Sequence, residues 1–291
     1  MQAFWSAGKP AAGLEPLGKE GQPMPSILLL EHLFRLAKEI VGTRCGREFD
    51  REDHLGFMML NYLAKQVDHG EAVVSLCQKG LFVDAALIAR AMLEGMAFVG
   101  FAGKSPDTRP RRWRLWAVVY DYRLLLDRRS RGHPPPDEIA DAVTERAFGP
   151  EGMMYFRASA RNMLRNQGHL DDRLREDPFV QHWYQPEAHT IRDVFDEADV
   201  ASLYEDQYVR ISKWSHWGIE GYADLIDFNW PRLDYSGGRP WIGEISARAA
   251  FHALWHVTHW FNARFEAGFE DPIDALLQEA IKLDPDPTSS T

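Results

Sequence analysis

The sequence predicts an all-α protein, an antiparallel bundle of long helices with shorter helices packed across it. Apolar residues recur at the three- and four-residue spacing of amphipathic helices over long stretches, and the alternating pattern of strands is absent. Breaks rich in proline and glycine, such as GHPPP at 132–136, separate these stretches. With 291 residues, 45% of them hydrophobic and 26% charged, the chain can bury a sizeable core.

The expected helices follow from caps and apolar spacing. The first begins with Ser26 as N-cap after Pro25 and ends at Gly42. The second follows the cap residue Asp50 and runs toward Gly80. The remaining helices are expected at 82–102, 109–131, 137–147, 150–167, 190–198, from close to 200, at 244–268 and at 272–283.

These helices are expected to form one domain over residues 26–283. Residues 1–25 are rich in Gly and Pro and are interpreted as a flexible arm, and 284–291 as a polar tail. DYSGGRPW at 234–241 is typical of a turn.

Composition restricts location and partners. The only cysteines are Cys45 and Cys77, too few for a disulfide framework. Neither the apolar core of a signal peptide nor roughly twenty apolar residues in a row are found, so we expect a cytoplasmic protein with no membrane partner. The net charge of −10 argues against broad nucleic-acid binding but allows a local basic groove.

The strongest candidate site is a polar stripe. Tyr208, Ser212, His216 and Glu220 stand four residues apart, so they share one face of a helix that is otherwise rich in Ile, Trp and Tyr. Buried polar groups must find partners. The stripe therefore indicates either a site for chemistry or binding, or a structural hydrogen-bond network between helices.

A second candidate is an ion pair in an apolar helix. Arg90 and Glu94 are four residues apart within ALIARAMLEGMAFV, and their surroundings predict partial burial. A buried ion pair needs further partners. We expect the helix of the polar stripe to supply them, with Glu94 orienting His216.

An Arg-x-x-x-Glu helix, a Trp-containing segment and a Tyr-x-x-x-Ser-x-x-x-His helix follow one another in this chain. This order resembles a bacterial family catalogued as domain of unknown function 5677, over roughly residues 55–260. The resemblance implies an all-helical fold. It also draws attention to Trp183 in HWYQPEAHTIRDVF as a candidate substrate-binding residue, with Arg90, Tyr208 and Ser212.

A second resemblance is to the HEPN superfamily of small helical bundles, which includes ribonuclease toxins and phage-defence effectors. Its motif places Arg four to six residues before His, usually with a polar residue after the Arg. Arg210 and His216 fit the spacing, with Ile211 in place of the polar residue.

This resemblance implies metal-independent RNA cleavage. Arg210 would hold the phosphate and His216 would move the proton. Independently of this resemblance, Glu94 is the third catalytic candidate, because it is expected to orient His216. No cofactor is expected. Since positions six apart on a helix point about 120° apart, the two residues would work best across a dimer interface or where the helix is kinked. A homodimer is the expected form.

Basic side chains are the compositional support for an RNA substrate. Eight arginines lie within 109–131, and Arg157, Arg161 and Arg165 are four residues apart. Solvated helix faces explain most such runs. A phosphate-binding groove is the alternative, in which Arg157 and Arg161 bind substrate.

Two other functions remain open. In the first, Arg90, Glu94, Tyr208, Ser212 and His216 belong to a non-catalytic binding or regulatory module, which holds a small anionic ligand or simply the bundle.

In the second, a metal-dependent enzyme uses His252, His256 and His259, which share a face in FHALWHVTHWFN. Three ligands from one straight helix rarely reach one ion, and HExxH is absent. Ordinary amphipathic histidines beside Trp255 and Trp260 are therefore favoured, and no metal is expected.

Overall fold

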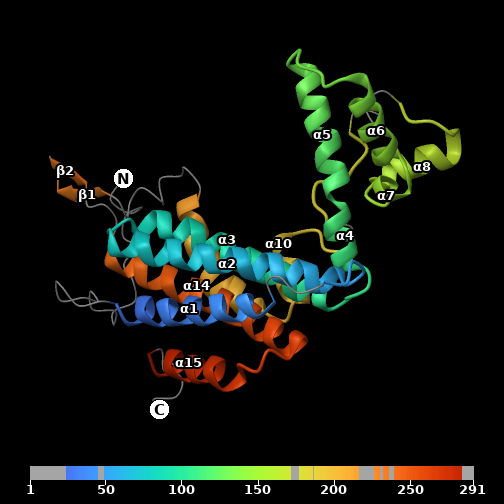
Figure 1. Cartoon of the computed structure of the whole chain (residues 1–291). Coiled ribbons are helices and arrows are strands. Elements are labelled where there is room, and N and C mark those ends of the chain that lie inside the picture. Colours follow the sequence, from blue (N-terminus) through green and yellow to red (C-terminus); the bar gives the residue numbers. More distant parts are fainter. Residues whose placement is uncertain are drawn as a thin grey trace. The chain divides into compact units, whose positions relative to one another are not determined.

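The computed structural model describes residues 24–44, 49–171, 177–185, 187–215, 226–229, 232–235 and 239–283. The predicted all-α class is confirmed: the chain is a bundle packed from helices (Figure 1). One short hairpin is the exception within the described residues. Its strands β1 (Ile226–Asn229) and β2 (Arg232–Tyr235) pair antiparallel, with Ile226 opposite Tyr235. No strand was expected there.

Contacts divide the chain into two compact units. Unit 1 comprises Met1–Phe49, Met59–Val99 and Val200–Thr291, and unit 2 comprises Asp50–Met58 and Gly100–Asp199. Such a division does not show whether each unit folds alone, so the single domain expected over 26–283 stays a prediction.

Unit 1 is built on long helices. Their bounds are α1 Pro25–Arg44, α2 His54–Gln78, α3 Phe82–Gly103, α14 Pro240–Phe265 and α15 Glu270–Leu283. The first residues of α2 and the last of α3 belong to unit 2. Helix α1 packs against α14 and α15 (Figure 1). It buries Leu30, Leu33, Ala37 and Ile40 completely, at the spacing of one helix face. The helix continues through Gly42, where an end was expected.

Helix α14 differs from its prediction at both ends. It begins with Pro240 in its first turn, where the missing N–H costs nothing. It ends before Glu266, whose φ of 48° is left-handed. The helix therefore spans 240–265 rather than 244–268.

Unit 2 consists of shorter helices. Their bounds are α4 Arg109–Leu115, α5 Ala117–Ser130, α6 Asp137–Phe148, α7 Pro150–Met153, α8 Ala158–Gln167 and α10 Ile191–Glu197. Helices α6 and α7 pack along α5 (Figure 1). Edge-to-face contacts join Tyr122, Phe148, Phe156 and Phe179 in the core. Two expected helices are divided: 109–131 at Trp116, and 150–167 at the bridge between Phe156 and Phe179.

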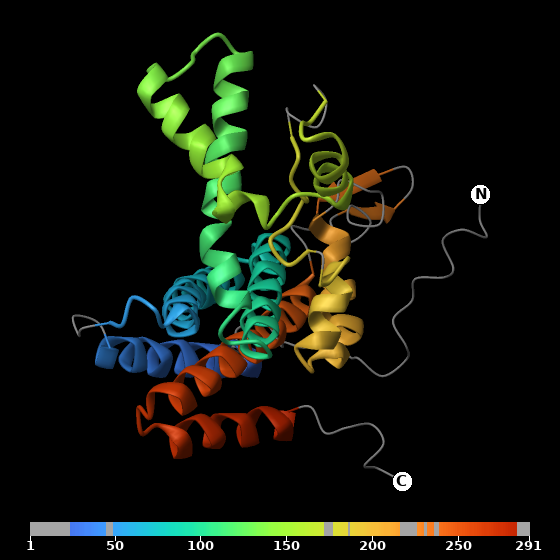
Figure 2. The same cartoon turned by 90° about the vertical axis from the view of Figure 1, so that its right-hand side faces the viewer.

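The segment predicted as a regular helix from about 200 changes its winding several times. Helix α11 (Ala201–Leu203) leads into a π-helical turn η3 (Tyr204–Tyr208), then α12 (Val209–Ser212) and a 3₁₀ turn η4 (Lys213–Ser215). The segment lies beside α3 and α14 (gold in Figure 2).

Helix α3 is, among the described residues, long and apolar enough to cross a membrane by length and composition alone. A single such helix is weak evidence, because the core helix of a soluble protein passes the same test. Of its most apolar window, 61% is buried inside the structure.

Candidate functional site

Three side chains of unit 1 form a closed hydrogen-bond network, the Arg90–Glu94–Tyr208 triad. Arg90 donates to the Tyr208 hydroxyl from Nη2 at 2.9 Å and from Nε at 3.3 Å. The same hydroxyl donates to Glu94 Oε1 at 2.6 Å. Arg90 Nη2 also lies 3.0 Å from Glu94 Oε1, as a salt bridge of residues four apart on α3. The expected partners of the ion pair are therefore supplied by the 201–215 segment, through Tyr208.

The ionisation of the triad follows from burial and from these bonds. Burial and the hydrogen bond to Glu94 raise the pKa of Tyr208 to about 12, so its hydroxyl keeps its proton at neutral pH. Burial alone would lower the pKa of Arg90, but the hydrogen bond to Tyr208 and the attraction of Glu94 outweigh it, and that pKa is raised. The network therefore couples a charged pair to a neutral hydroxyl.

The backbone at Tyr208 is unusual. In the π turn the N–H of Val209 donates to the carbonyl of Tyr204, five residues back. The Tyr204 and Tyr208 rings stack, with centroids 5.2 Å apart and planes at 20°. Single π turns are rare and frequent at functional sites. Ser212, expected on the same face, donates its hydroxyl proton to the carbonyl of Tyr208 at 2.6 Å.

The π turn also contacts α14. Gln207 Nε2 lies 2.6 Å from His252 Nδ1. The other end of the amide, Oε1, is buried and has no hydrogen-bond partner among the described residues. Adjacent residues of one turn, Gln207 and Tyr208, thus hold it to two long helices.

Of the two predicted reacting groups, Arg210 and His216, only Arg210 lies within the described residues, and it is not a member of the triad. Arg210 is exposed, and the described residues provide neither a hydrogen bond nor an ion pair for it. His216 and Glu220 lie outside the described residues, so the expected contact between Glu94 and His216 stays a prediction.

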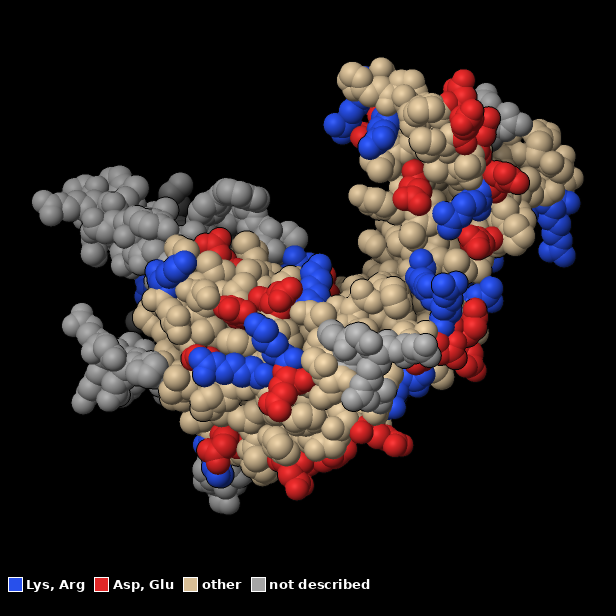
Figure 3. Space-filling view, viewed as in Figure 1, with Lys and Arg blue, Asp and Glu red and all other residues tan. Residues whose placement is uncertain are grey.

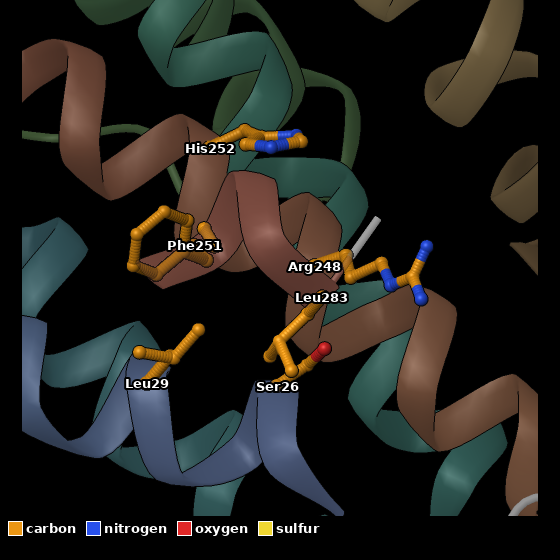
Figure 4. A pocket seen from close by; sticks show the side chains of 7 residues that line it. Ser26, Leu29, Arg248, Phe251, His252 and Leu283 are labelled. Atoms are coloured by element: carbon orange, nitrogen blue, oxygen red, sulfur yellow. The ribbon is translucent and has the colours of Figure 1, made fainter. Parts of the chain in front are cut away.

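A hollow in unit 1 adjoins this region. Ser26 and Leu29 of α1 and Arg248, Phe251 and His252 of α14 line it, with α15 closing one side (Figure 4). Glu244, only 5% exposed, accepts a hydrogen bond from the Ser26 hydroxyl and another from Arg248 Nε at 3.2 Å. Its second oxygen is buried without a partner in the described chain. Burial, with the charge of Glu244 second, raises the pKa of Cys77 to about 12.

Three candidate substrate-binding residues have structural contacts within unit 2. Trp183 is buried and its ring meets Phe101 edge to face at 5.7 Å. Arg157 donates to the carbonyl of Phe179 at 2.6 Å, and Arg161 to that of Phe156 at 2.9 Å. These contacts stabilise the fold of unit 2, whereas the substrate role of all three residues stays a prediction.

Most of the other arginines in 109–131 are engaged as well. Arg109 and Arg112 share Glu187, Arg123 binds Asp177, and Arg131 binds Asp127. Arg109 Nη1 also donates to the carbonyl of Phe101 at 2.9 Å. On the face drawn in Figure 3, basic and acidic side chains alternate, as expected of solvated helix faces.

The three histidines of α14 do not gather as metal ligands. The described residues contain no group of three or more His, Cys, Asp or Glu that could hold a metal ion. His259 stacks on Trp255 at 5.1 Å and 13°, and His256 contacts Trp260. Burial, with His252 and His259 next, lowers the pKa of His256 to about 4. The interpretation as histidines packed beside tryptophans fits these contacts.

Sequence reasoning missed two members of the site, Gln207 and Tyr204. Tyr204 stands four residues before Tyr208 and so continues the spacing of the stripe, a signal that could have found it. Gln207 lies off that face in a regular helix. The local sequence pattern did not predict the π turn itself, which is held by contacts with α3 and α14.

The fold and the site together define an all-helical protein with a hydrogen-bonded Arg–Tyr–Glu network between α3 and a π-helical turn. The chain belongs to the family of unknown function DUF5677, whose model matches residues 57–231. The matched region contains the triad, Arg210 and His216. Comparison with curated proteins found no match, and neither did comparison with solved structures.

Proposed function

We propose that the chain is a HEPN-like, metal-independent ribonuclease of the toxin or defence class, active as a homodimer, with Arg210 and His216 as its reacting groups. The observation that carries the proposal is the state of Arg210. It is exposed and unpaired among the described residues, whereas Arg90, Arg157 and Arg161 are engaged. The motif places Arg four to six residues before His, and an exposed guanidinium at that position can bind a phosphate.

The chemistry is an internal transesterification. The 2′-hydroxyl oxygen of RNA attacks the adjacent phosphorus, the bond from phosphorus to the 5′-oxygen breaks, and a 2′,3′-cyclic phosphate forms with a free 5′-hydroxyl. His216 carries the proton from the attacking oxygen to the leaving oxygen. Arg210 balances the negative charge that gathers on the phosphate oxygens.

The test is cleavage of single-stranded RNA by purified protein in EDTA, with all-deoxy oligonucleotide as the substrate control. We expect the wild type to cut only RNA, and His216→Ala and Arg210→Ala each to lose at least about a hundredfold in rate. His32→Ala and Arg35→Ala, exposed side chains of α1, are the matched controls and should keep full activity. An inactive wild type, or full activity in His216→Ala, would refute the proposal.

A second candidate function is a non-catalytic module that binds a small anion at Arg90. It is favoured by the closed network of the triad, in which Arg90 still keeps 27% of its side chain exposed. In this case no RNA is cut, and inorganic phosphate raises the melting temperature of the wild type but not of Arg90→Gln. Equal shifts in both proteins would exclude Arg90 as the anion site.

A further inference from the structure

We infer that Tyr208 is a positioning residue that fixes the direction in which Arg210 leaves the helix. The expected effect on RNA binding rests on the proposed function. The effect of Tyr208 on the conformation of residues 204–212 does not. Three features of the described chain support this role: the anchoring of Tyr208, the π turn, and the angle between positions 208 and 210.

Tyr208 is anchored from several sides. Only 6% of it is exposed, and its hydroxyl is shared between Arg90 and Glu94. Its ring is stacked on Tyr204, and the Arg90 guanidinium carbon lies 5.2 Å from its centroid. The hydroxyl can satisfy both α3 side chains because it donates and accepts at once.

Because of the π turn, the anchoring of Tyr208 affects the direction of the side chains that follow it. A π turn holds one more residue than the α-helix on either side, so it persists where outside contacts support it. Tyr208 and Gln207 supply those contacts, to α3 and to His252 of α14. When the support is removed, the turn can return to α-helical winding. The shift by one residue then rotates the next turn of the helix by about 100°.

Arg210 comes two residues after Tyr208, so their side chains point about 200° apart on the helix. With Tyr208 held inward, Arg210 has to point outward, and the structure has Tyr208 buried and Arg210 exposed. Holding Tyr208 therefore holds the guanidinium of Arg210 at one place on the surface.

The first experiment is a double-mutant cycle on the binding of a non-cleavable 2′-O-methyl RNA, measured by fluorescence anisotropy. Arg210→Ala is expected to weaken binding about five- to tenfold, the loss of one charge-assisted contact. Tyr208→Phe keeps the ring and loses the hydroxyl, and it should weaken binding by a similar factor. In the double variant Tyr208→Phe adds nothing, because it acts through Arg210. Independent effects that multiply would overturn the inference.

The second experiment needs no RNA. Amide hydrogen exchange at 204–212 should rise at least about tenfold in Tyr208→Phe, while exchange in α14 stays at its wild-type rate. Glu94→Gln, which keeps an acceptor for the hydroxyl, is the milder variant and should show a smaller rise at the same amides. Tyr120→Phe, an exposed tyrosine of α5, is the control. Unchanged exchange at 204–212 would overturn the inference.

The two proposals fail differently. A wild type that binds the 2′-O-methyl RNA but does not cut RNA refutes the ribonuclease function, and the cycle still decides the role of Tyr208. A wild type that does not bind RNA also refutes the ribonuclease function. Hydrogen exchange at 204–212 then decides the role of Tyr208 by itself.

Discussion

Tyr208 is the residue on which the triad depends, because one hydroxyl satisfies both members of an ion pair. Arg90 and Glu94 alone would form an ordinary pair worth a few tenths of a kcal/mol. The buried hydroxyl adds two bonds to Arg90 and one to Glu94, and removing it takes these bonds from both side chains. Phe has the same ring and cannot replace that bond.

His256 provides a residue-scale prediction in acid. Its pKa is lowered to about 4 by burial and by the neighbouring His252 and His259, while the unfolded chain titrates near 6.5. Between these values the unfolded state binds more protons, so stability falls as pH drops from about 6.5 to 4. Urea unfolding at a series of pH values should show this loss in the wild type and a smaller loss in His256→Gln.

The control for this prediction is His32→Gln, an exposed histidine, which should follow the wild-type curve. Some acid sensitivity will remain in His256→Gln, because the pKa of His69 is also lowered, chiefly by burial. Identical curves for the wild type and His256→Gln would contradict the half-buried, neutral state of His256.

At the scale of the elements, sequence patterns predicted the long helices well and the breaks poorly. Burial at helical spacing is a local property, so α1, α2, α3 and α14 could be anticipated within a few residues. Near the break at Trp116 a distant side chain is bound: the Tyr155 hydroxyl donates to the carbonyl of Arg112. The amide of Trp116 then contacts the carbonyls of both Arg112 and Trp113.

The candidate site shows the same division. The i, i+4 pair on α3 and the stripe containing Tyr208 could be recognised because each is a spacing along one helix. The sequence could not tell which member of the stripe contacts Arg90 and Glu94, because the π turn changes the rotation of the helix just before Tyr208. The structure has the Tyr208 hydroxyl bound to Glu94, while the expected contact of Glu94 with His216 lies outside the described residues and stays a prediction.

Two glycines give an element-scale prediction. A Cβ on Gly152, between α6 and α8, would lie 1.9 Å from the carbonyl oxygen of Ala147. Gly152→Ala should therefore destabilise the protein by more than about 3 kcal/mol, because backbone has to move. Gly42 lies within α1 with nothing within 4 Å of a Cβ. Gly42→Ala should stabilise by about 0.5–1 kcal/mol, the helix preference of Ala over Gly.

Urea unfolding followed by circular dichroism measures both changes. The pair is matched, because the same methyl group is added in a crowded corner and on an open helix face. An unchanged free energy of unfolding in Gly152→Ala would contradict the close contact between Gly152 of α7 and the carbonyl of Ala147.

At the scale of the whole molecule, most described arginines of the 109–131 and 157–165 runs bind carboxylates or carbonyls of their own unit. With a net charge of −10, the chain has no general attraction for RNA. An RNA substrate would then be held by few contacts, and exposed groups such as Arg210 would have to provide most of the binding.

The proposed homodimer makes a prediction at this scale. If each site takes Arg210 from one subunit and His216 from the other, a mixed dimer of Arg210→Ala and His216→Ala contains one intact site. Random assembly of equal amounts should therefore restore about a quarter of wild-type activity. Co-expression with two affinity tags isolates the mixed dimer for the assay. No activity in that dimer would mean that both residues act within one subunit.

The most direct test of the ribonuclease function is the chemistry of the cut ends. Mass spectrometry of RNA fragments produced in EDTA should find 2′,3′-cyclic phosphate at one end and 5′-hydroxyl at the other, and Arg210→Ala should produce neither. Intact RNA, or fragments that carry 5′-phosphate, would contradict the account.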